Sequence, residues 1–392
     1  MVSSTMPDPM RSETALPRYA GIDALRGLSI LLVVLHHLAL RIPLKKTALA
    51  DIVPGRVLGA LSYNGYEAVF VFFVISGFLI ANHSLARWGS LANIDLRAFY
   101  ARRAGRILPC LLLLLAVLAL LHLAGAADYV IHQPGQSLPR ALVAALGLHL
   151  NWYEGATGYL PGSWDVLWSL SIEETFYLGF PLVCMSVRSR ALLAMALVAL
   201  VCSIPFALMA ITDNEIWKEK AYLPGMGAIA AGVLAALATR RWPQPPRALV
   251  AAVGVFGAGG LLALMFAMRE LWPLLHDFVM FWLVACAACL VYALAHARGS
   301  GVCGLAWLRS MGRYSYEIYL GHMFVVFAIV AAFKAAGSDL RSGWLWYVPA
   351  VLTCWALGAL VGRFYSDPCA RALTQRLARK AVPDAAIPQR LA

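Results

Sequence analysis

Residues 22–40 read IDALRGLSILLVVLHHLAL, an apolar run long enough to cross a lipid bilayer as a helix. Runs of this kind recur along the chain, and 61% of its 392 residues are hydrophobic while only 13% are charged. An ordinary soluble domain carries about 25% charged residues. The composition excludes a soluble enzyme, a disordered chain and a secreted domain held together by disulfides. It predicts an all-α polytopic membrane protein.

Ten apolar segments have about the length of a transmembrane helix. They are residues 22–40, 66–82, 107–124, 165–187, 191–211, 223–239, 249–268, 275–296, 315–335 and 346–364. Residues 141–152 are apolar but too short to cross the membrane, so we expect a re-entrant or interfacial segment there. The expected organisation is an N-terminal segment 1–21, a membrane domain 22–364 and a basic tail 365–392.

The basic residues predict the orientation, because Lys and Arg favour loops on the cytoplasmic side of a membrane. With both termini inside, the inner segments hold 20 Lys and Arg and the outer segments hold 9. We therefore expect a multi-pass protein of the cell (inner) membrane with both termini in the cytoplasm. One outer loop is an exception, because it carries Arg41, Lys45, Lys46 and Arg56. The net charge of +12 does not indicate nucleic-acid binding, since the basic residues lie between apolar runs and form no continuous face.

The eight cysteines lie mostly inside apolar runs, as small packing residues do. Cys286 and Cys289 are close in sequence and would share one face of a helix. A metal site normally needs a second ligand pair at suitable spacing, and the sequence shows none. We therefore expect no metal.

Charged residues inside the first expected span are candidates for function, because a charge within a membrane is costly. Asp23 and Arg26 are three residues apart, so they share a helix face and could form an ion pair. His37 follows Arg26 on the same face, about 16 Å further along the helix axis. The alternative is that Asp23 and Arg26 mark the helix start and His37 its outer interface.

Two other segments carry charge next to apolar sequence. Arg103 and Arg106 face one way at the mouth of the third span, and guanidinium groups suit phosphate oxygens. They could equally be a stop-transfer cluster or contact lipid headgroups. Glu173 and Glu174 are adjacent in an aromatic-rich span and point about 100° apart on a helix, so at most one need face a cavity.

Five strings, in order, resemble the membrane acyltransferase family 3, which includes bacterial O-acetyltransferases acting on surface sugars. They are the Asp-Ala-Leu-Arg start with ten residues between Arg26 and His37, FFVISGFLI at 72–80, the arginine cluster leading into Ile-Leu-Pro at 107–109, WSLSIEETFYL at 168–178 and YSYEIYLGH at 314–322. The Ser-Gly step of the second string permits close helix approach. In the last string, His322 and Glu317 lie in a span, and helix packing with a buried Glu317 is the alternative to a functional role.

Two features depart from that family. Ala68-Val69-Phe70 stand where members often carry Gly-Val-Asp, so the acidic residue is missing. Many members also carry an extracytoplasmic esterase-like domain, whereas we expect a stand-alone membrane unit here.

The resemblance implies transfer of an acyl group, usually acetyl, from cytoplasmic acyl-CoA to a hydroxyl of a carbohydrate-containing acceptor, without a metal. It makes His37 the catalytic histidine and places Arg26 in the same motif. It places Arg103 and Arg106 in the motif linked to the CoA donor, and Glu173 at the family's acidic position.

The residues leave the mechanism open. His37 could act as a general base on the acceptor hydroxyl or form a covalent acyl-imidazole. Asp23 or Glu173 could orient the imidazole. The rival functions are a transporter or flippase for a lipid-linked sugar, and an assembly subunit that kept the fold without the chemistry.

Overall fold

The computed structural model describes residues 18–211, 213–297 and 304–379. Helices account for 83% of these residues and strands for none of them, which confirms the all-α class. The α-helices are α1 (Ala20–Ala39), α2 (Gly55–Tyr63), α3 (Gly65–Trp88), α4 (Leu96–Leu123), α5 (Leu138–Leu146), α6 (Leu150–Thr157), α7 (Gly162–Asp165), α8 (Leu167–Ser186), α9 (Arg190–Met209), α10 (Glu215–Glu219), α11 (Tyr222–Arg241), α12 (Arg247–Leu275), α13 (Val279–His296), α14 (Ala306–Arg313), α15 (Ser315–Ala335), α16 (Tyr347–Val361) and α17 (Asp367–Arg379). Short 3₁₀ turns are η1 (Leu44–Lys46), η2 (Ala48–Asp51), η3 (Leu91–Asn93), η4 (His276–Phe278) and η5 (Leu340–Trp346), and η6 (Gly362–Ser366) is a π-helical turn.

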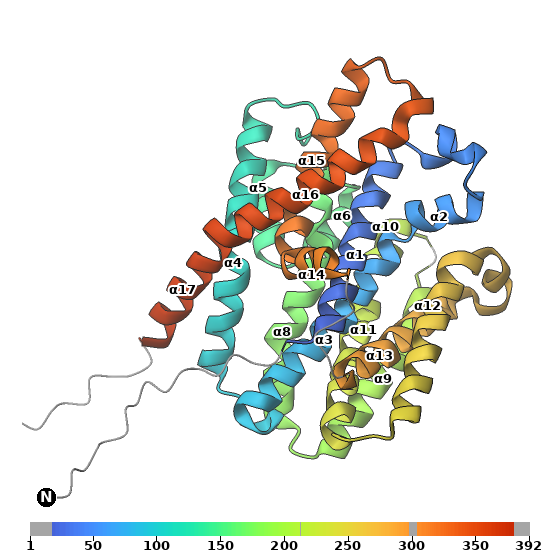
Figure 1. Cartoon of the computed structure of the whole chain (residues 1–392). Helices are drawn as coiled ribbons and strands as arrows, with labels where there is room; N and C mark the ends of the chain where they lie inside the picture. The colour runs from blue at the N-terminus through green and yellow to red at the C-terminus, as the bar shows by residue number, and fades with distance from the viewer. Residues whose placement is uncertain (1–17, 212, 298–303, 380–392) are drawn as a thin grey trace, which may run out of the picture.

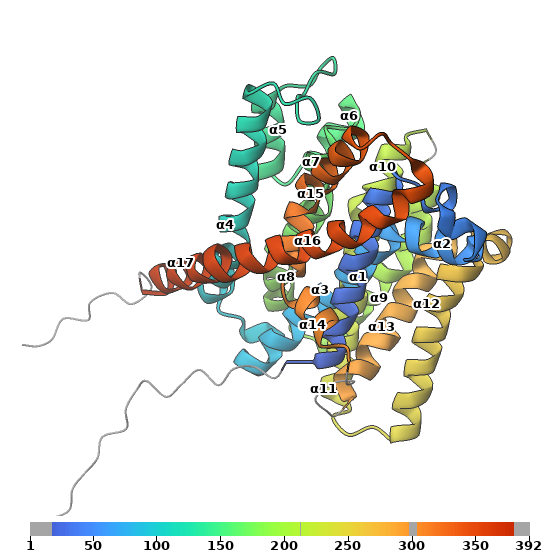
Figure 2. The ribbon, with the colours of Figure 1, turned by 45° about the horizontal axis from the view of Figure 1, so that its top comes forward.

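Eight helical stretches among the described residues are long and apolar enough to cross a membrane. One of them, Arg247–His296, contains both α12 and α13, which run side by side in Figure 2. Helix α8 is as long as α1 but carries Glu173 and Glu174, and it is not among the eight. Each expected span coincides with one of the long helices, and the polytopic membrane class is confirmed.

The segment 141–152 is divided between two short helices, α5 and α6. Between them, Leu148 adopts a left-handed backbone conformation with φ of 58°. L-residues rarely adopt this conformation, so it ends the first helix and redirects the chain. Neither helix has the length of a membrane span, and the re-entrant or interfacial placement stays a prediction.

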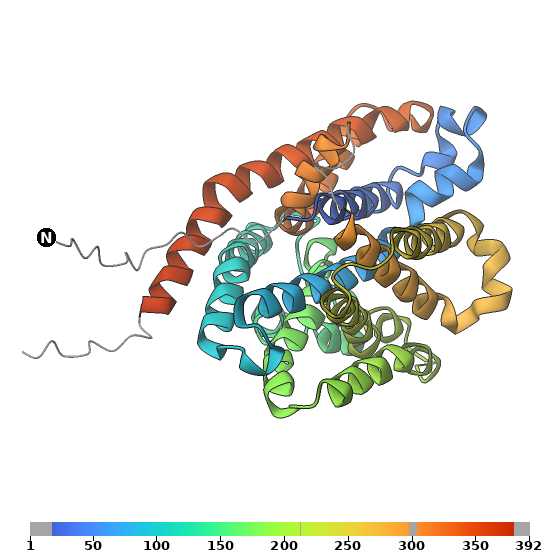
Figure 3. The same cartoon turned by 60° about the horizontal axis from the view of Figure 1, so that its bottom comes forward.

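Helix α1 lies inside the bundle. It packs against α3, α14, α15 and α16, and Figure 3 shows it between α3 and α16. Glycines permit the closest of these contacts, because a side chain on Gly27 would meet the backbone of Leu308 and one on Gly312 the backbone of Asp23. The face that carries Arg26 and His37 is therefore held in the interior.

Helices α3 and α11 also pack backbone to backbone. A Cβ atom on Gly77 would lie 1.9 Å from the carbonyl oxygen of Ile229, and one on Gly232 would lie 1.9 Å from that of Val74. The close approach expected at the Ser-Gly step of 72–80 is confirmed at Gly77. Small residues allow this packing within a membrane, where there is little hydrophobic drive between helices.

The last helices form one continuous run. In Figure 1, α16 and α17 cross the bundle obliquely, and η6 joins them without a break. Helix α17 packs on α4, where Gly105 leaves room for Ala370 and Thr374. The expected basic tail thus begins as a helix, while residues 1–17 and 380–392 lie outside the described residues.

We expect Gly77→Ala to lower the melting temperature of the protein in detergent, because the added methyl group would clash with the Ile229 carbonyl. Overpacking of this kind costs about 1–3 kcal/mol. Gly179→Ala is the matched control, because no heavy atom lies within 4 Å of a Cβ at that position of α8. Equal melting temperatures for the two variants would contradict the close packing of α3 on α11.

Candidate functional site

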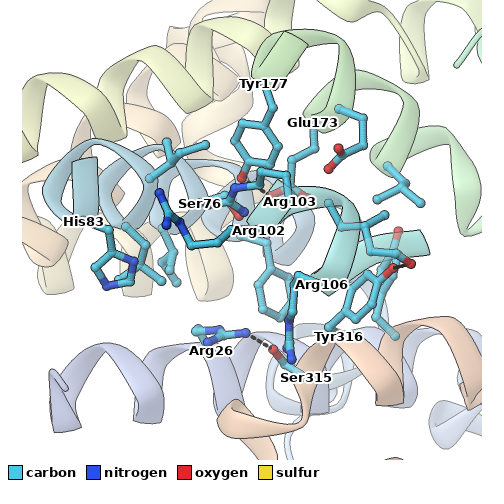
Figure 4. A pocket seen from close by; sticks show the side chains of 18 of the residues that line it. Arg26, Ser76, His83, Arg102, Arg103, Arg106, Glu173, Tyr177, Ser315 and Tyr316 are labelled. Carbon is cyan, nitrogen blue, oxygen red and sulfur yellow. Dashed lines mark hydrogen bonds between the residues drawn. The ribbon is translucent and has the colours of Figure 1, made fainter. Parts of the chain in front are cut away.

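Two cavities lie in succession along the same helices. The arginine cavity has a volume of about 580 Å³ and is lined by α1, α3, α4, α8 and α15 (Figure 4). The histidine cavity has a volume of about 340 Å³ and is lined by α1, α3, α8 and α15 further along. Val69 and Tyr319 line both cavities, so they form a partition between them.

Cationic side chains dominate the arginine cavity. Arginines that line it are Arg18, Arg26, Arg87, Arg102, Arg103, Arg106 and Arg313. Arg26 donates a hydrogen bond of 2.9 Å to the hydroxyl of Ser315, drawn in Figure 4. The Arg103 guanidinium lies 4.4 Å from the ring centroid of Tyr177, in a cation–π contact. The cavity thus brings together Arg26, Arg103 and Arg106, which the sequence singled out.

A buried carboxylate fixes Arg106. The Glu317 side chain is 1% exposed and lies 3.3 Å from the Arg106 guanidinium. It also accepts a hydrogen bond of 2.7 Å from Ser366 in η6, and Asp367 of α17 lies 3.8 Å from Arg106. Glu317 therefore links α15 to the last helices, and it also lines the arginine cavity.

Glu173 and Glu174 both line the arginine cavity, although the sequence required at most one of them to do so. The cavity is lined by one broad side of α8, which carries Ser169, Leu170 and Tyr177 as well as the two glutamates. Glu173 accepts a hydrogen bond of 2.5 Å from Tyr177. One oxygen of Glu174 is buried without a hydrogen-bond partner among the described residues. Glu173 does not line the histidine cavity and has no contact with His37 among the described residues.

Asp23 lies at the start of α1, outside both cavities. Its carboxylate is 3.8 Å from Arg18. The suggested pair with Arg26 is not formed in the part of the chain that the structure describes, because Arg26 turns to Ser315. Asp23 therefore makes no contact that orients the imidazole of His37 there.

The hydrogen bonds of His37 determine which of its nitrogens is basic. Its Nδ1 lies 2.9 Å from the carbonyl oxygen of Val33, which can only accept, so Nδ1 carries the hydrogen. His322 Nδ1 likewise donates to the carbonyl of Tyr319 at 2.7 Å. The Nε2 of His322 is then free to accept from His37 Nδ1 at 3.4 Å. His37 Nε2 therefore carries no hydrogen, and its lone pair makes it the basic nitrogen of this imidazole.

A second imidazole, His36, also lines the histidine cavity. Its Nδ1 bonds the carbonyl oxygen of Ser62 at 2.9 Å, away from His322. Among the described residues, no group of three or more His, Cys, Asp or Glu is placed to hold a metal ion. The three histidines are thus arranged through hydrogen bonds to backbone carbonyls.

The rest of the histidine cavity is aromatic and charged. The rings of Tyr66 and Trp168 stack with centroids 6.0 Å apart. Asp165 and Glu219 contribute carboxylates to the wall. Arg41 lies one turn beyond His37 and donates to the backbone carbonyl of His37 at 2.8 Å. This places one basic residue of the exceptional outer loop in the cavity.

Asp165 is held by a buried lysine that sequence reasoning missed. The Lys220 side chain is 0% exposed, lies 2.7 Å from Glu154 and also contacts Asp165. Burial raises the pKa of the Glu154 carboxyl to about 7, although Lys220 favours its charged form. The sequence could not predict this cluster, because its three residues are far apart along the chain. Nothing in the short segment around Lys220 indicates that the lysine would be buried.

A family profile and one named relative match this chain over most of its length, and a second relative matches less than half of it. The sequence profile of a family described as Acyltransferase domain matches residues 19–363. Acyltransferase MdmB of Streptomyces mycarofaciens is 28% identical over 403 aligned positions, covering 94% of this chain and 96% of that protein. O-acetyltransferase OatA of Staphylococcus aureus is 31% identical over 179 positions, covering 43% of this chain and 25% of that protein. No solved structure matches significantly.

We expect Lys220→Met to destabilise the protein by about 3–5 kcal/mol, because it leaves two carboxylates without their buried cation. Thermal unfolding in detergent measures the effect. Lys218→Met is the matched control, since Lys218 is half exposed in its pair with Asp277 and such pairs contribute about 0–1 kcal/mol. Similar melting temperatures for both variants would show that the buried cluster does not stabilise the fold.

Proposed function

Since this chain belongs to the acyltransferase domain family, we propose that it transfers an acetyl group from acyl-CoA to a hydroxyl of a carbohydrate-containing acceptor. The observation that carries the proposal is the succession of two cavities along the same helices. One is rich in arginine, the other holds an imidazole with a free lone pair, and Val69 and Tyr319 separate them.

The arginine cavity suits the donor. CoA carries several phosphate groups, and guanidinium groups bind phosphate through charge-assisted hydrogen bonds. Arg103 and Arg106 come from one helix, α4, and Arg26 faces them from α1 (Figure 4). From Arg26 to His37 the helix rises about 16 Å, which the long pantetheine arm of CoA would span by passing the partition.

His37 would act as a general base. Its Nε2 would take the proton of the acceptor hydroxyl while the hydroxyl oxygen attacks the carbonyl carbon of the thioester. The carbon–sulfur bond then breaks, and the leaving thiolate takes the proton from His37. The Val33 carbonyl supports this role, because it accepts the hydrogen of His37 Nδ1 and so keeps Nε2 of His37 as the basic atom. General-base assistance contributes about 10²–10⁴-fold.

The walls of the histidine cavity support a carbohydrate-containing acceptor. Tyr66, Tyr159 and Trp168 offer apolar ring faces, and Asp165 and Glu219 offer acceptors for hydroxyl hydrogens. Such a combination suits a ring with an apolar face and a hydroxylated rim. The family and its named relatives argue for an acyltransferase over the transporter and scaffold alternatives.

The charge distribution supports an orientation for this reaction. The arginine cavity is lined by residues of the segment 83–106, one of the segments that make up the excess of basic residues predicted to be cytoplasmic. Acyl-CoA would enter from the cytoplasm, and the acceptor would enter from the opposite side. The lipid bilayer, acyl-CoA and the acceptor are then the partners of the protein.

Replacing His37 with alanine should lower the transfer of labelled acetyl groups from acetyl-CoA to membrane material by about 10²–10⁴-fold. Binding of acetyl-CoA should persist, because His37 lines the other cavity. Both are measured on membranes containing the protein. Full transfer by the His37→Ala variant would contradict the role of His37 as the base. So would a result in which only His36→Ala abolishes transfer.

Replacing Arg103 with alanine should raise the dissociation constant of acetyl-CoA about tenfold or more, because hydrogen bonds to charged groups contribute about 1.5–3 kcal/mol. Arg97→Ala is the matched control, since Arg97 is an exposed arginine of the same helix and does not line the cavity. Equilibrium binding of labelled acetyl-CoA compares them. Equal affinities for acetyl-CoA would show that Arg103 does not bind the donor, and would favour a role in membrane topology.

A further inference from the structure

The partition between the cavities contains a hydrogen-bonded pair of hydroxyl groups. Tyr319 of α15 lines both cavities, and its Oη lies 2.7 Å from Oγ of Ser169 in α8. Val69 of α3 completes the partition and is 6% exposed. Neither hydroxyl has a role in the mechanism derived so far, although any group that passes from one cavity to the other must pass them.

The neighbours of Ser169 show which hydroxyl can give up its hydrogen. Ser169 Oγ lies 3.3 Å from the carbonyl oxygen of Val166, which can only accept. Ser169 donates there, so its oxygen accepts the phenolic hydrogen of Tyr319. The Tyr319 hydroxyl can exchange this partner for another acceptor without leaving a buried backbone group unpaired.

Tyr319 also contacts His322, which is a neighbour of His37. Its ring centroid is 5.9 Å from that of His322, which lies 4.8 Å from that of His37. The backbone carbonyl of Tyr319 accepts the hydrogen of His322 Nδ1 at 2.7 Å. Tyr319 and His37 thus both line the histidine cavity and both pack near His322, and Tyr319 lines the arginine cavity as well.

We propose that Tyr319 is a further catalytic residue, which donates a hydrogen bond to the carbonyl oxygen of the donor thioester. The inference rests on the proposed function, in which the thioester must lie at the partition to reach His37. Attack by the acceptor oxygen moves the carbonyl π electrons onto the carbonyl oxygen, and the Tyr319 hydroxyl hydrogen-bonds this oxyanion. The tyrosine keeps its proton, the carbonyl re-forms as the carbon–sulfur bond breaks, and the hydroxyl returns to Ser169.

The hydroxyl distinguishes this role from simple closure of the passage. A residue that merely separates the cavities needs the aromatic ring, whereas an oxyanion donor needs the O–H group. An oxyanion in an apolar partition is costly unless a donor is already in place, and removing one such donor lowers kcat by about 10²–10³-fold. Tyr319→Phe keeps the ring and removes the hydroxyl, so it separates the two roles.

The first test is spectroscopic and needs no acceptor. Acetyl-CoA labelled with ¹³C at the carbonyl is bound to the purified protein, and the carbonyl stretch is recorded by difference infrared spectroscopy. A hydrogen bond polarises the carbonyl, so we expect a lower frequency on the wild-type protein than in apolar solvent. The shift should persist in Ser169→Ala, which keeps the phenol, and disappear in Tyr319→Phe.

The second test is kinetic. Tyr319→Phe should lower kcat about 100-fold with little change in the KM for acetyl-CoA, because the donor contacts in the arginine cavity remain. Ser169→Ala should lower kcat far less, because it keeps the Tyr319 hydroxyl. Tyr347→Phe is the control for loss of a buried tyrosine hydroxyl, since that hydroxyl donates to the Ile42 carbonyl outside both cavities.

The outcomes separate this inference from the function on which it rests. Bound acetyl-CoA with the same carbonyl frequency in wild type and Tyr319→Phe would overturn the role of Tyr319 and leave the donor assignment standing. Equal losses of kcat in Tyr319→Phe and Ser169→Ala would overturn it as well, because the hydrogen bond between them would then be structural. Failure of the folded wild-type protein to bind any acyl-CoA would overturn both proposals.

Discussion

The cost of keeping charged groups inside an apolar bundle organises this protein. Charges within a membrane persist where they have partners or face a polar cavity. Lys220 is enclosed with two carboxylates. Arg106 contacts the buried Glu317 and also lines the arginine cavity, together with Arg26 and Arg103. The arrangement thus separates the buried cluster at Lys220 from the arginines that line a cavity.

Close helix packing makes this separation possible. Helices α3 and α11 touch through glycines on both sides, and α1 touches α14 in the same way. These contacts hold α1 and α3, two of the helices that line both cavities, against their neighbours at backbone-to-backbone distance. The side chains of Arg26 and His37 then point inward from one helix at a constant spacing, because the rise along an α-helix is constant.

Sequence alone could predict what depends on spacing along one helix. It identified the long helices, the shared face of Arg26 and His37, and the small step at Gly77. It could not predict partners that come from distant segments, so Arg26 turns to Ser315 instead of Asp23, and Lys220 meets residues more than 50 positions away. The position of Tyr319 between two cavities could not be predicted either, because a tyrosine within a membrane span is typical of a residue that only packs against its neighbours.

The succession of the cavities has an energetic consequence for the proposed reaction. The proton removed from the acceptor hydroxyl starts in the histidine cavity, and it ends on a thiol that withdraws through the arginine cavity. The acyl group moves in the opposite direction, from the arginine cavity to the acceptor. The acceptor and CoA would each leave with the charge that they brought. The proposed transfer would therefore carry no net charge along the bundle axis, and a membrane potential would not drive it.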